Sequence, residues 1–200
     1  MNFISHRVNT IEALDATDQA YGVEVDIRSH GSQLVIHHDP FAPGVSFQDW
    51  LSHYRHGTLI LNVKEEGLEE RLIGMMSTHG IDDYFFLDQS FPFMIKWASA
   101  SGGRSAVRVS EFESVGTALS VANIVSWVWV DCFTRFPLES DEAKQLKTAG
   151  FKLCLVSPEL HGRDLAGIEI MARELLNKDI EIDAICSKKP EIWQNVLNCK

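Results

Sequence analysis

The feature that most constrains the fold is an alternation of short apolar runs with helix-like segments along the chain. The apolar runs end near Ser5, Asp26, Lys64, Asp88, Ser110, Cys132, Val156 and Ser187. Strands that alternate with helices indicate a parallel sheet, because each helix returns the chain to the same edge. Eight such repeats predict an α/β protein of the compact (β/α)8 TIM-barrel type, for which about 200 residues is the lower size limit.

An open, doubly wound sheet is the alternative architecture. It requires a glycine-rich phosphate turn after the first strand, and the segment Ser5-His6-Arg7-Val8 contains no glycine. The chain has no low-complexity or Pro/Ser-rich linker, and 45% of its residues are hydrophobic. These properties favour one domain over residues 1–200, with a single sizeable core.

Two helix predictions are specific enough to be checked residue by residue. Asn9 or Thr10 is expected to cap a helix over residues 11–21, with Ile11, Leu14 and Ala20 facing inward. A second helix is expected over residues 65–78, ended by Gly80.

The formal net charge of −10 argues against nucleic acid or an anionic membrane surface as the main partner. No apolar run approaches the ~20 residues that a membrane helix needs, so we expect no membrane insertion. The first residues resemble a strand and lack the features of a signal peptide, which favours a cytoplasmic protein. The four cysteines, Cys132, Cys154, Cys186 and Cys199, have no C-x-x-C spacing, as expected in a reducing compartment. The sequence does not predict the oligomeric state.

The stretch from Gly22 to Asp39 carries two acids, Glu24 and Asp26, two residues apart on an apolar run. In a strand both side chains project from one face, and Arg28 follows on that face. Two buried like charges repel each other, and a hard divalent cation between them would remove the repulsion. A half-exposed edge strand with solvated acids is an equally good interpretation of this stretch alone.

Polar side chains finish nearly every predicted strand. They are His6, Arg7, Glu24, Asp26, His38, Asp39, Asn62, Lys64, Asp88, Arg108, Ser110, Glu111, Asp131, Ser157, Glu159, Ser187 and Lys188. In a barrel these ends meet at one rim, so the pattern predicts a functional site there. Structural roles compete with this hypothesis: His6 could be a core or capping histidine, and Lys64 a solvated strand end. Arg108 and Asp131 could form a structural ion pair or bind substrate.

On these residues the chain resembles the glycerophosphodiester phosphodiesterase family, within the phospholipase-C-like barrel superfamily. That family opens with His-Arg and an Asn-Thr, then shows Glu-x-Asp, His-Asp and Glu-x-Lys on successive strands. The matching positions are His6-Arg7, Asn9-Thr10, Glu24-Val25-Asp26, His38-Asp39 and Asn62-Val63-Lys64. Several later runs, such as Phe86-Leu87-Asp88-Gln89-Ser90, look more like a divergent bacterial branch associated with surface-polysaccharide loci.

The resemblance implies a role for each matching residue. Glu24, Asp26 and Asn62 would bind one divalent cation, Mg²⁺ or Ca²⁺. His6 and His38 would act as general acid and base. Arg7 and Lys64 would hold phosphate oxygens, with Arg108 and Asp131 as further candidates for substrate binding. The substrate would be a small-molecule or glycan phosphodiester.

One departure from the family is chemically important. The family carries a carboxylate where this chain has Asn62, so the site loses one negative charge and should bind metal more weakly. Asp88 or Glu111 could restore that charge. Three hypotheses follow: a metal-dependent phosphodiesterase, a barrel that binds a phosphorylated ligand without turnover, and a lyase that forms a cyclic phosphate.

Overall fold

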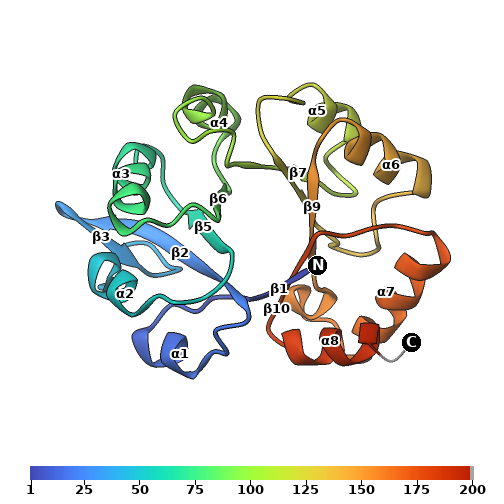
Figure 1. Ribbon diagram of the computed structural model, residues 1–200, viewed down its shortest axis with the longest axis horizontal. Coiled ribbons are helices and arrows are strands. Elements are labelled where there is room, and N and C mark those ends of the chain that lie inside the picture. The colour runs from blue at the N-terminus through green and yellow to red at the C-terminus, as the bar shows by residue number, and fades with distance from the viewer. Residues whose placement is uncertain (199–200) are drawn as a thin grey trace. The chain divides into compact units, whose positions relative to one another are not determined.

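The computed structural model describes residues 1–198. The chain divides into two compact units. The first unit is residues 6–105, and the second is residues 1–5 together with residues 106 onward. Both are mixed α/β structures in which strands and helices alternate along the chain (Figure 1).

The first unit holds a five-stranded sheet in the order β4-β3-β2-β5-β6. Its elements are α1 (Ile11–Ala16), β2 (Gly22–His30), β3 (Gln33–Ile36), β4 (Val45–Ser46), α2 (Phe47–His53), β5 (Leu59–Val63), α3 (Glu69–His79), β6 (Tyr84–Leu87) and α4 (Phe91–Trp97). Strands β2, β5 and β6 run parallel, whereas β3 and β4 form an antiparallel extension of β2. The parallel core of this unit places the carboxyl end of β5 beside Asp26 and Ile27, in the middle of β2.

The second unit holds five parallel strands in the order β1-β10-β9-β8-β7. Its elements are β1 (Asn2–Ser5), β7 (Ala106–Val109), α5 (Val115–Leu119), β8 (Trp127–Val130), α6 (Ser140–Thr148), β9 (Lys152–Val156), the 3₁₀ helix η1 (Pro158–His161), α7 (Ala166–Asn177), β10 (Ala184–Ser187) and α8 (Pro190–Asn198). The first strand of the chain is therefore the partner of the last, with Phe3 paired to Ile185.

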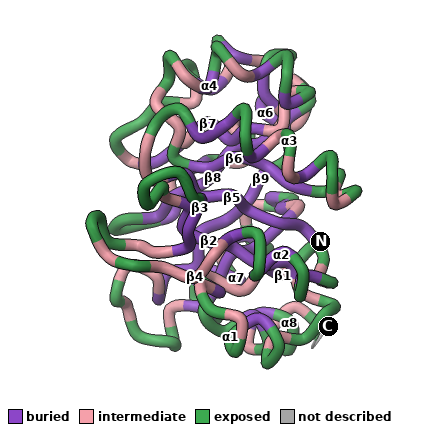
Figure 2. Tube along the Cα trace, turned by 90° about the vertical axis from the view of Figure 1, so that its left-hand side faces the viewer, coloured by how far each residue is buried: buried purple, intermediate pink, exposed green. Residues whose placement is uncertain are grey.

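The strands of both units are mainly buried, as the purple segments of Figure 2 show. In the first unit the core joins the strands to α1, α2 and α3 through large side chains such as Leu14, Trp50 and Leu72. The indole of Trp50 is fully buried and donates a hydrogen bond to the carbonyl of Val8 at 3.1 Å. This bond fixes the segment that leads out of β1 against α2.

The predicted alternation of eight strands and helices is confirmed in the described residues, with β3 and β4 as additional short strands. Thr10 is the N-cap of α1, and its hydroxyl accepts a bond from the Ala13 amide. The predicted length of this helix is wrong, because Thr17 adopts an extended conformation and ends it at Ala16. Ala20 is consequently exposed rather than inward-facing.

Gly80 ends α3 as predicted, in the left-handed conformation that glycine tolerates best. The predicted start of this helix at residue 65 is wrong, because α3 begins at Glu69. Three of the cysteines, Cys132, Cys154 and Cys186, are free and buried, and Cys199 lies outside the described residues. Over residues 1–198, no helix combines the length and apolar character that crossing a membrane requires.

Candidate active site

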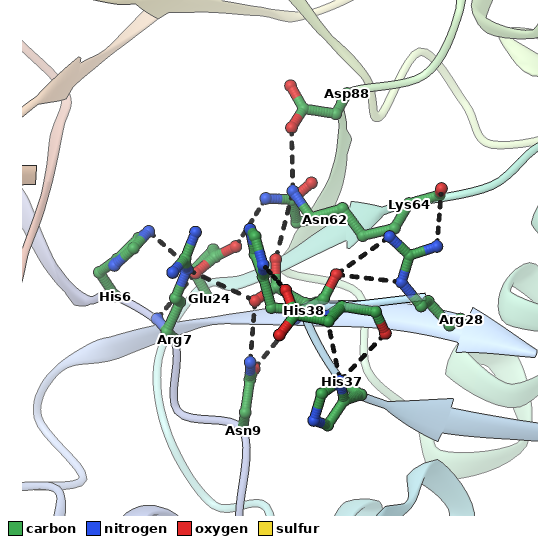
Figure 3. Close-up of polar contacts among 12 residues, drawn as sticks. His6, Arg7, Asn9, Glu24, Arg28, His37, His38, Asn62, Lys64 and Asp88 are labelled. Atoms are coloured by element: carbon green, nitrogen blue, oxygen red, sulfur yellow. Dashed lines mark hydrogen bonds and ion pairs between the residues drawn. The ribbon is translucent and has the colours of Figure 1, made fainter. Parts of the chain in front are cut away.

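A cluster of charged side chains lies in the first unit, where β2 and β5 run side by side. Glu24 and Asp26 project from β2 and are fully buried, as the period of two predicts. Asp26 is the register partner of Asn62 on β5, and Asn62 is 6% exposed. The amide of Asn62 donates a 2.8 Å hydrogen bond to Oε1 of Glu24. The three proposed metal ligands therefore lie together (Figure 3).

The backbone just after β1 completes the surroundings of Glu24. The amide of Arg7 donates to Oε2 of Glu24 at 2.7 Å, and Nε2 of His6 lies 3.7 Å from the same oxygen. Arg7 has a φ of 54°, in the left-handed region that non-glycine residues seldom adopt. This backbone conformation turns the Arg7 amide toward the carboxylate, and such strain is concentrated at functional sites.

Asp26 is held by one neutral and two cationic side chains. Asn9 donates to its Oδ2 at 2.8 Å and accepts from its backbone amide at 3.1 Å. Nε of Arg7 lies 3.6 Å from Oδ2, and Nζ of Lys64 lies 3.2 Å from Oδ1. Arg7 and Lys64, which the family resemblance assigned to phosphate binding, thus contact Asp26, which the resemblance assigned to metal binding.

Lys64 also contacts Asp88, with Nζ 3.2 Å from Oδ2. Asp88 follows β6 and has a φ of 61°, a second left-handed residue at this cluster. A hollow of about 340 Å³ opens beside Lys64 and Asp88, and Gln89 and Ser90 also line it. The hollow lies beside the Lys64 ammonium, and three further acids, Glu65, Glu66 and Glu69, also line it.

The electrostatics of Glu24 differ from those of an ordinary carboxylate. Burial, and next the charge of Asp26, raise the pKa of Glu24 from 4.5 to about 7. The hydrogen bonds from Asn62 and the Arg7 amide and the charge of Lys64 act in the opposite direction. The pair therefore favours a bound proton or cation more than two solvated carboxylates would.

The oxygen atoms of this cluster suit a hard cation. Oδ1 of Asn62 is buried and has no hydrogen-bond partner among residues 1–198, and Oδ1 of Asp26 has an ion pair but no hydrogen bond. Exchanging the two ends of the Asn62 amide would place its oxygen 2.8 Å from Oε1 of Glu24. Two ligands of an octahedral Mg²⁺ ion lie about 2.9 Å apart, so this donor set fits such an ion.

The fit depends on the amide, because the described residues contain no group of three or more His, Cys, Asp or Glu side chains placed to hold a metal. A cation held here would have the two carboxylates as side-chain ligands, with the Asn62 amide oxygen as the candidate third. Such a set carries one negative charge fewer than three carboxylates and would bind a cation more weakly.

His38 lies after β3, with its side chain 44% exposed and its Nδ1 2.9 Å from Oδ1 of Asp39. This hydrogen bond, followed by the nearby histidine charges, lowers the pKa of Asp39. The neighbouring His37 is tied through Nδ1 to the backbone of Asp39 at 3.0 Å. The ring of His38 therefore has a fixed partner on one nitrogen, as catalytic imidazoles often do.

Arg28 is a site residue whose role the sequence did not reveal. Its Nε and Nη2 each donate to the carbonyl of His38 at 3.0 Å, and its Nη1 donates to the carbonyl of Lys64 at 3.3 Å. One guanidinium thus joins the backbones that carry His38 and Lys64 (Figure 3). Its place on the Glu24 and Asp26 face was the only sequence signal for this role.

Arg108 and Asp131 belong to the second unit. Nη1 of Arg108 lies 3.1 Å from Oδ2 of Asp131, so they form the ion pair that was one of the two expectations for them. Glu111 is also in the second unit, where its carboxylate accepts hydrogen bonds from residues 133–135.

Comparisons with known proteins found similarity in the fold and none in the sequence. It matches no protein-family model, and no curated protein sequence matches it. The glycerophosphodiester phosphodiesterase of Agrobacterium tumefaciens superposes with a TM-score of 0.69 at 15% identity, covering 99% of both chains. The enzyme of that name from Parabacteroides distasonis gives 0.67 at 13% identity, covering 98% of this chain and 96% of the other.

These neighbours confirm, at the level of the fold, the resemblance seen in the sequence, and the low identities are those of a divergent branch. Tryptophan synthase from M. tuberculosis also superposes, with a TM-score of 0.59 at 9% identity over 97% of this chain and 86% of the other. Because an enzyme of a different kind has a similar fold, the function has to be inferred from the site.

Proposed function

We propose that the chain is a divalent-metal-dependent phosphodiesterase that acts on a glycerophosphodiester or a phosphate-linked glycan. The observation that carries this proposal is the buried pair Glu24 and Asp26, with Asn62 beside it and the cations of Arg7 and Lys64 against it. We further propose that the eight strand–helix repeats close into a (β/α)8 barrel and that the protein acts in the cytoplasm.

Glu24, Asp26 and Asn62 would hold the cation, Mg²⁺ or Ca²⁺. When bound, it would stabilise negative charge on the phosphoryl group and acidify an attacking hydroxyl or water. Arg7 and Lys64 are already within 3.6 Å and 3.2 Å of Asp26, and they would exchange part of this contact for phosphate oxygens. The hollow beside Lys64 would receive the adjoining part of the substrate.

Proton transfer would be divided between the two histidines. One would accept the proton of the attacking oxygen, and the other would donate a proton to the leaving oxygen. His6 is next to Glu24, and Asp39 orients the ring of His38. Such a pair predicts a bell-shaped dependence of the rate on pH.

The test measures hydrolysis of glycerophosphocholine by the purified protein with Mg²⁺ or Ca²⁺, and again with a chelator. His38→Ala should reduce kcat by about 10²–10⁴-fold, the usual contribution of a general acid or base. His30→Ala is the matched control, because His30 is an exposed histidine at the end of β2, the strand that pairs with β3. Equal activity of the two variants would refute the role of His38.

A specific observation favours a second function, ligand binding without turnover. Asn62 presents its amide nitrogen to Glu24, and Arg7, Asn9 and Lys64 already occupy the oxygens of Asp26. A protein of this kind would bind glycerol phosphate and consume no diester.

A lyase would consume the diester and release a cyclic phosphate, whose mass is lower than that of the hydrolysis product by one water.

A further inference from the structure

The ammonium of Lys64 lies between two carboxylates and contacts them in different ways. Its Nζ is 3.2 Å from Oδ1 of Asp26 and 3.2 Å from Oδ2 of Asp88. It donates a hydrogen bond to Asp88, whereas Oδ1 of Asp26 accepts no hydrogen bond from residues 1–198 (Figure 3). The ammonium thus directs an N–H group at Asp88, and Asp26 receives its charge alone.

The loop after β6 fixes the position of Asp88. Its φ of 61° is left-handed, a conformation that Asp and Asn adopt more readily than most residues with a side chain. The next residue, Gln89, donates to Oε1 of Glu69 at 3.2 Å and accepts from the hydroxyl of Ser105 at 2.7 Å. Glu69 and Ser105 are fully buried, so they anchor Gln89 in the core. The loop therefore sets the direction from which the Asp88 carboxylate meets Lys64.

The direction of the Lys64 N–H groups matters because Asp26 is a proposed ligand of the divalent cation. Oδ2 of Asp26 accepts a bond from Asn9 at 2.8 Å and lies 3.6 Å from Nε of Arg7. Oδ1 is the less engaged oxygen of this carboxylate. An ammonium that donated a hydrogen bond to Oδ1 would take up a lone pair that the cation needs.

The charges around Asp26 favour the same arrangement. The two buried acids of β2 carry two negative charges, which Arg7 and Lys64 would cancel if both paired with them fully. Asp88 shares the charge of Lys64 and so leaves a net negative charge at the proposed cation site. It would thereby compensate for the third carboxylate that the site lacks, without being a ligand itself.

We propose that Asp88 is a positioning residue that holds the Lys64 ammonium off Oδ1 of Asp26 and so sets the affinity of the site for a divalent cation. The inference rests on the proposed function, since it takes Asp26 as a ligand of that cation. With Asp88 in place, the ammonium stays beside the site, where it can donate to a phosphate oxygen of the substrate. Without Asp88, the ammonium would turn its N–H groups to Asp26 and compete with the cation for Oδ1.

The test is a double-mutant cycle of Asp88 and Lys64, in which the affinity for Mg²⁺ and Ca²⁺ is measured by calorimetric titration of the whole protein. Asp88→Asn should weaken cation binding about tenfold, as expected when a charge-assisted hydrogen bond is lost and the ammonium becomes a competitor. The variant should fold, because Asp88 is exposed and Asn tolerates the same φ. Lys64→Met should tighten binding severalfold, because it removes the ammonium next to Asp26.

The combination of the two substitutions is the decisive measurement. In the Lys64→Met protein, Asp88→Asn should change the affinity no more than about threefold, because no ammonium remains to be positioned. Glu66→Gln is the matched control, since it removes a negative charge from the wall of the same hollow. It should weaken binding no more than about threefold at about 0.15 M salt, where exposed charges are screened.

Two results would overturn the proposal while leaving the proposed function intact. One is a loss of about tenfold from Asp88→Asn both with and without Lys64, which would make Asp88 a ligand or a general source of charge. The other is a cation affinity that Asp88→Asn does not change. If the unmodified protein bound neither Mg²⁺ nor Ca²⁺ up to about 10 mM, the metal dependence in the proposed function would be refuted, and this inference with it.

Discussion

Glu24 in the first unit and Glu159 in the second are both buried carboxylates that accept hydrogen bonds, and they differ in what else lies beside them. Glu159 accepts hydrogen bonds from the hydroxyls of Ser157 and Ser187 and from the amide of Lys188. Glu24 accepts hydrogen bonds from the Asn62 side-chain amide and the Arg7 backbone amide, but it lies next to Asp26, a second buried acid. The donors thus compensate the burial of Glu159, whereas at Glu24 the like charge of Asp26 leaves a demand for a proton or a cation.

The difference separates two uses of the same residue type. A carboxylate that neutral donors satisfy is part of the scaffold, and its replacement should cost stability. A carboxylate placed against another acid gains stability from a bound proton or cation, and its replacement should cost function.

Glu24→Gln and Glu159→Gln should change stability in opposite directions. The pKa of Glu24 is raised from 4.5 to about 7, so its stabilising contribution is complete below pH 4.5 and is lost as the pH rises through 7. At pH 8 with a chelator, removal of the charge in Glu24→Gln should raise the free energy of unfolding by on the order of 3 kcal/mol, of which about 2 kcal/mol is lost again because the new amide nitrogen faces the Asn62 or the Arg7 donor. Glu159→Gln should lower it by about 2 kcal/mol, because an amide nitrogen would face hydrogen-bond donors.

Denaturant unfolding at pH 8 and at pH 4.5 measures both effects. The gain from Glu24→Gln should disappear at pH 4.5, where the carboxylate of the folded protein is already protonated. Equal destabilisation by the two variants at pH 8 would show that Glu24 is as well satisfied as Glu159, and the comparison would fail.

Asn62→Asp should sharpen the contrast by completing an acidic site. A third carboxylate raises the charge of the donor set, so the affinity for Ca²⁺ or Mg²⁺ should increase by at least about tenfold. Without metal, the same variant should lower stability, since the hydrogen bond from the Asn62 amide to Glu24 is replaced by repulsion. Metal titration followed by calorimetry measures the affinity, with the exposed Asn123→Asp as the control.

The outcome of this substitution also separates the two proposed functions. Tighter metal binding together with faster diester cleavage would support a phosphodiesterase weakened by Asn62. Tighter metal binding without any consumption of substrate would support the ligand-binding alternative. Unchanged metal affinity would remove Asn62 from the donor set.

Arg28→Lys should affect activity more than stability, because Arg28 acts on two backbone segments of the site. A lysine cannot bond both the His38 and the Lys64 carbonyls as the guanidinium does. We expect kcat to fall about tenfold with a smaller change in KM, as for a residue that orients catalytic groups. Steady-state kinetics of diester cleavage provides the measurement.

Arg104→Lys is the matched control for this prediction. Its guanidinium also bonds two backbone carbonyls, those of Asp82 and Ser101, each at 3.0 Å. Both variants therefore lose similar hydrogen bonds, and only Arg28 joins residues of the site. A similar loss of kcat in both would reduce Arg28 to a structural residue.

The sequence predicted those parts of the site that follow from strand geometry. A period of two places Glu24 and Asp26 on one face, and parallel neighbours bring Asn62 beside Asp26. The repeat of strands and helices and the Thr10 cap depend on local patterns and were also predictable. Closure into a barrel involves how the two units meet, and it stays a prediction.

Other features could not be read from the sequence because they depend on tertiary contacts. The Asn62 amide presents its nitrogen to Glu24, a choice that no pattern encodes. The partner of Asp131, His161, comes 30 residues later on a 3₁₀ turn that has no strand or helix period. The left-handed backbone of Arg7 is imposed by its bond to Glu24, and arginine has no propensity for it.

Replacement of Glu111 should have the smallest effect. Its pKa is lowered, whereas the pKa of Glu24 is raised. Burial acts to raise the pKa of Glu111, but the hydrogen bonds from Arg135 and Thr134 outweigh it and lower the pKa from 4.5 to about 2. Its stabilising contribution is present above pH 4.5 and is lost as the pH falls through 2. Glu111→Gln should therefore lower Tm by about 2 °C at pH 7 and leave it unchanged at pH 2.

Thermal unfolding followed by circular dichroism measures this effect, with the exposed Glu181→Gln of the same unit as the control. The pH dependence is the decisive part, because Glu24 loses its contribution as the pH rises whereas Glu111 loses its own as the pH falls. If Glu111→Gln lowered Tm equally at both pH values, the loop at residues 133–135 would be held by shape rather than by charge. The Phe133 ring would then owe its position to packing, and the contrast between the two carboxylates would be confined to Glu24.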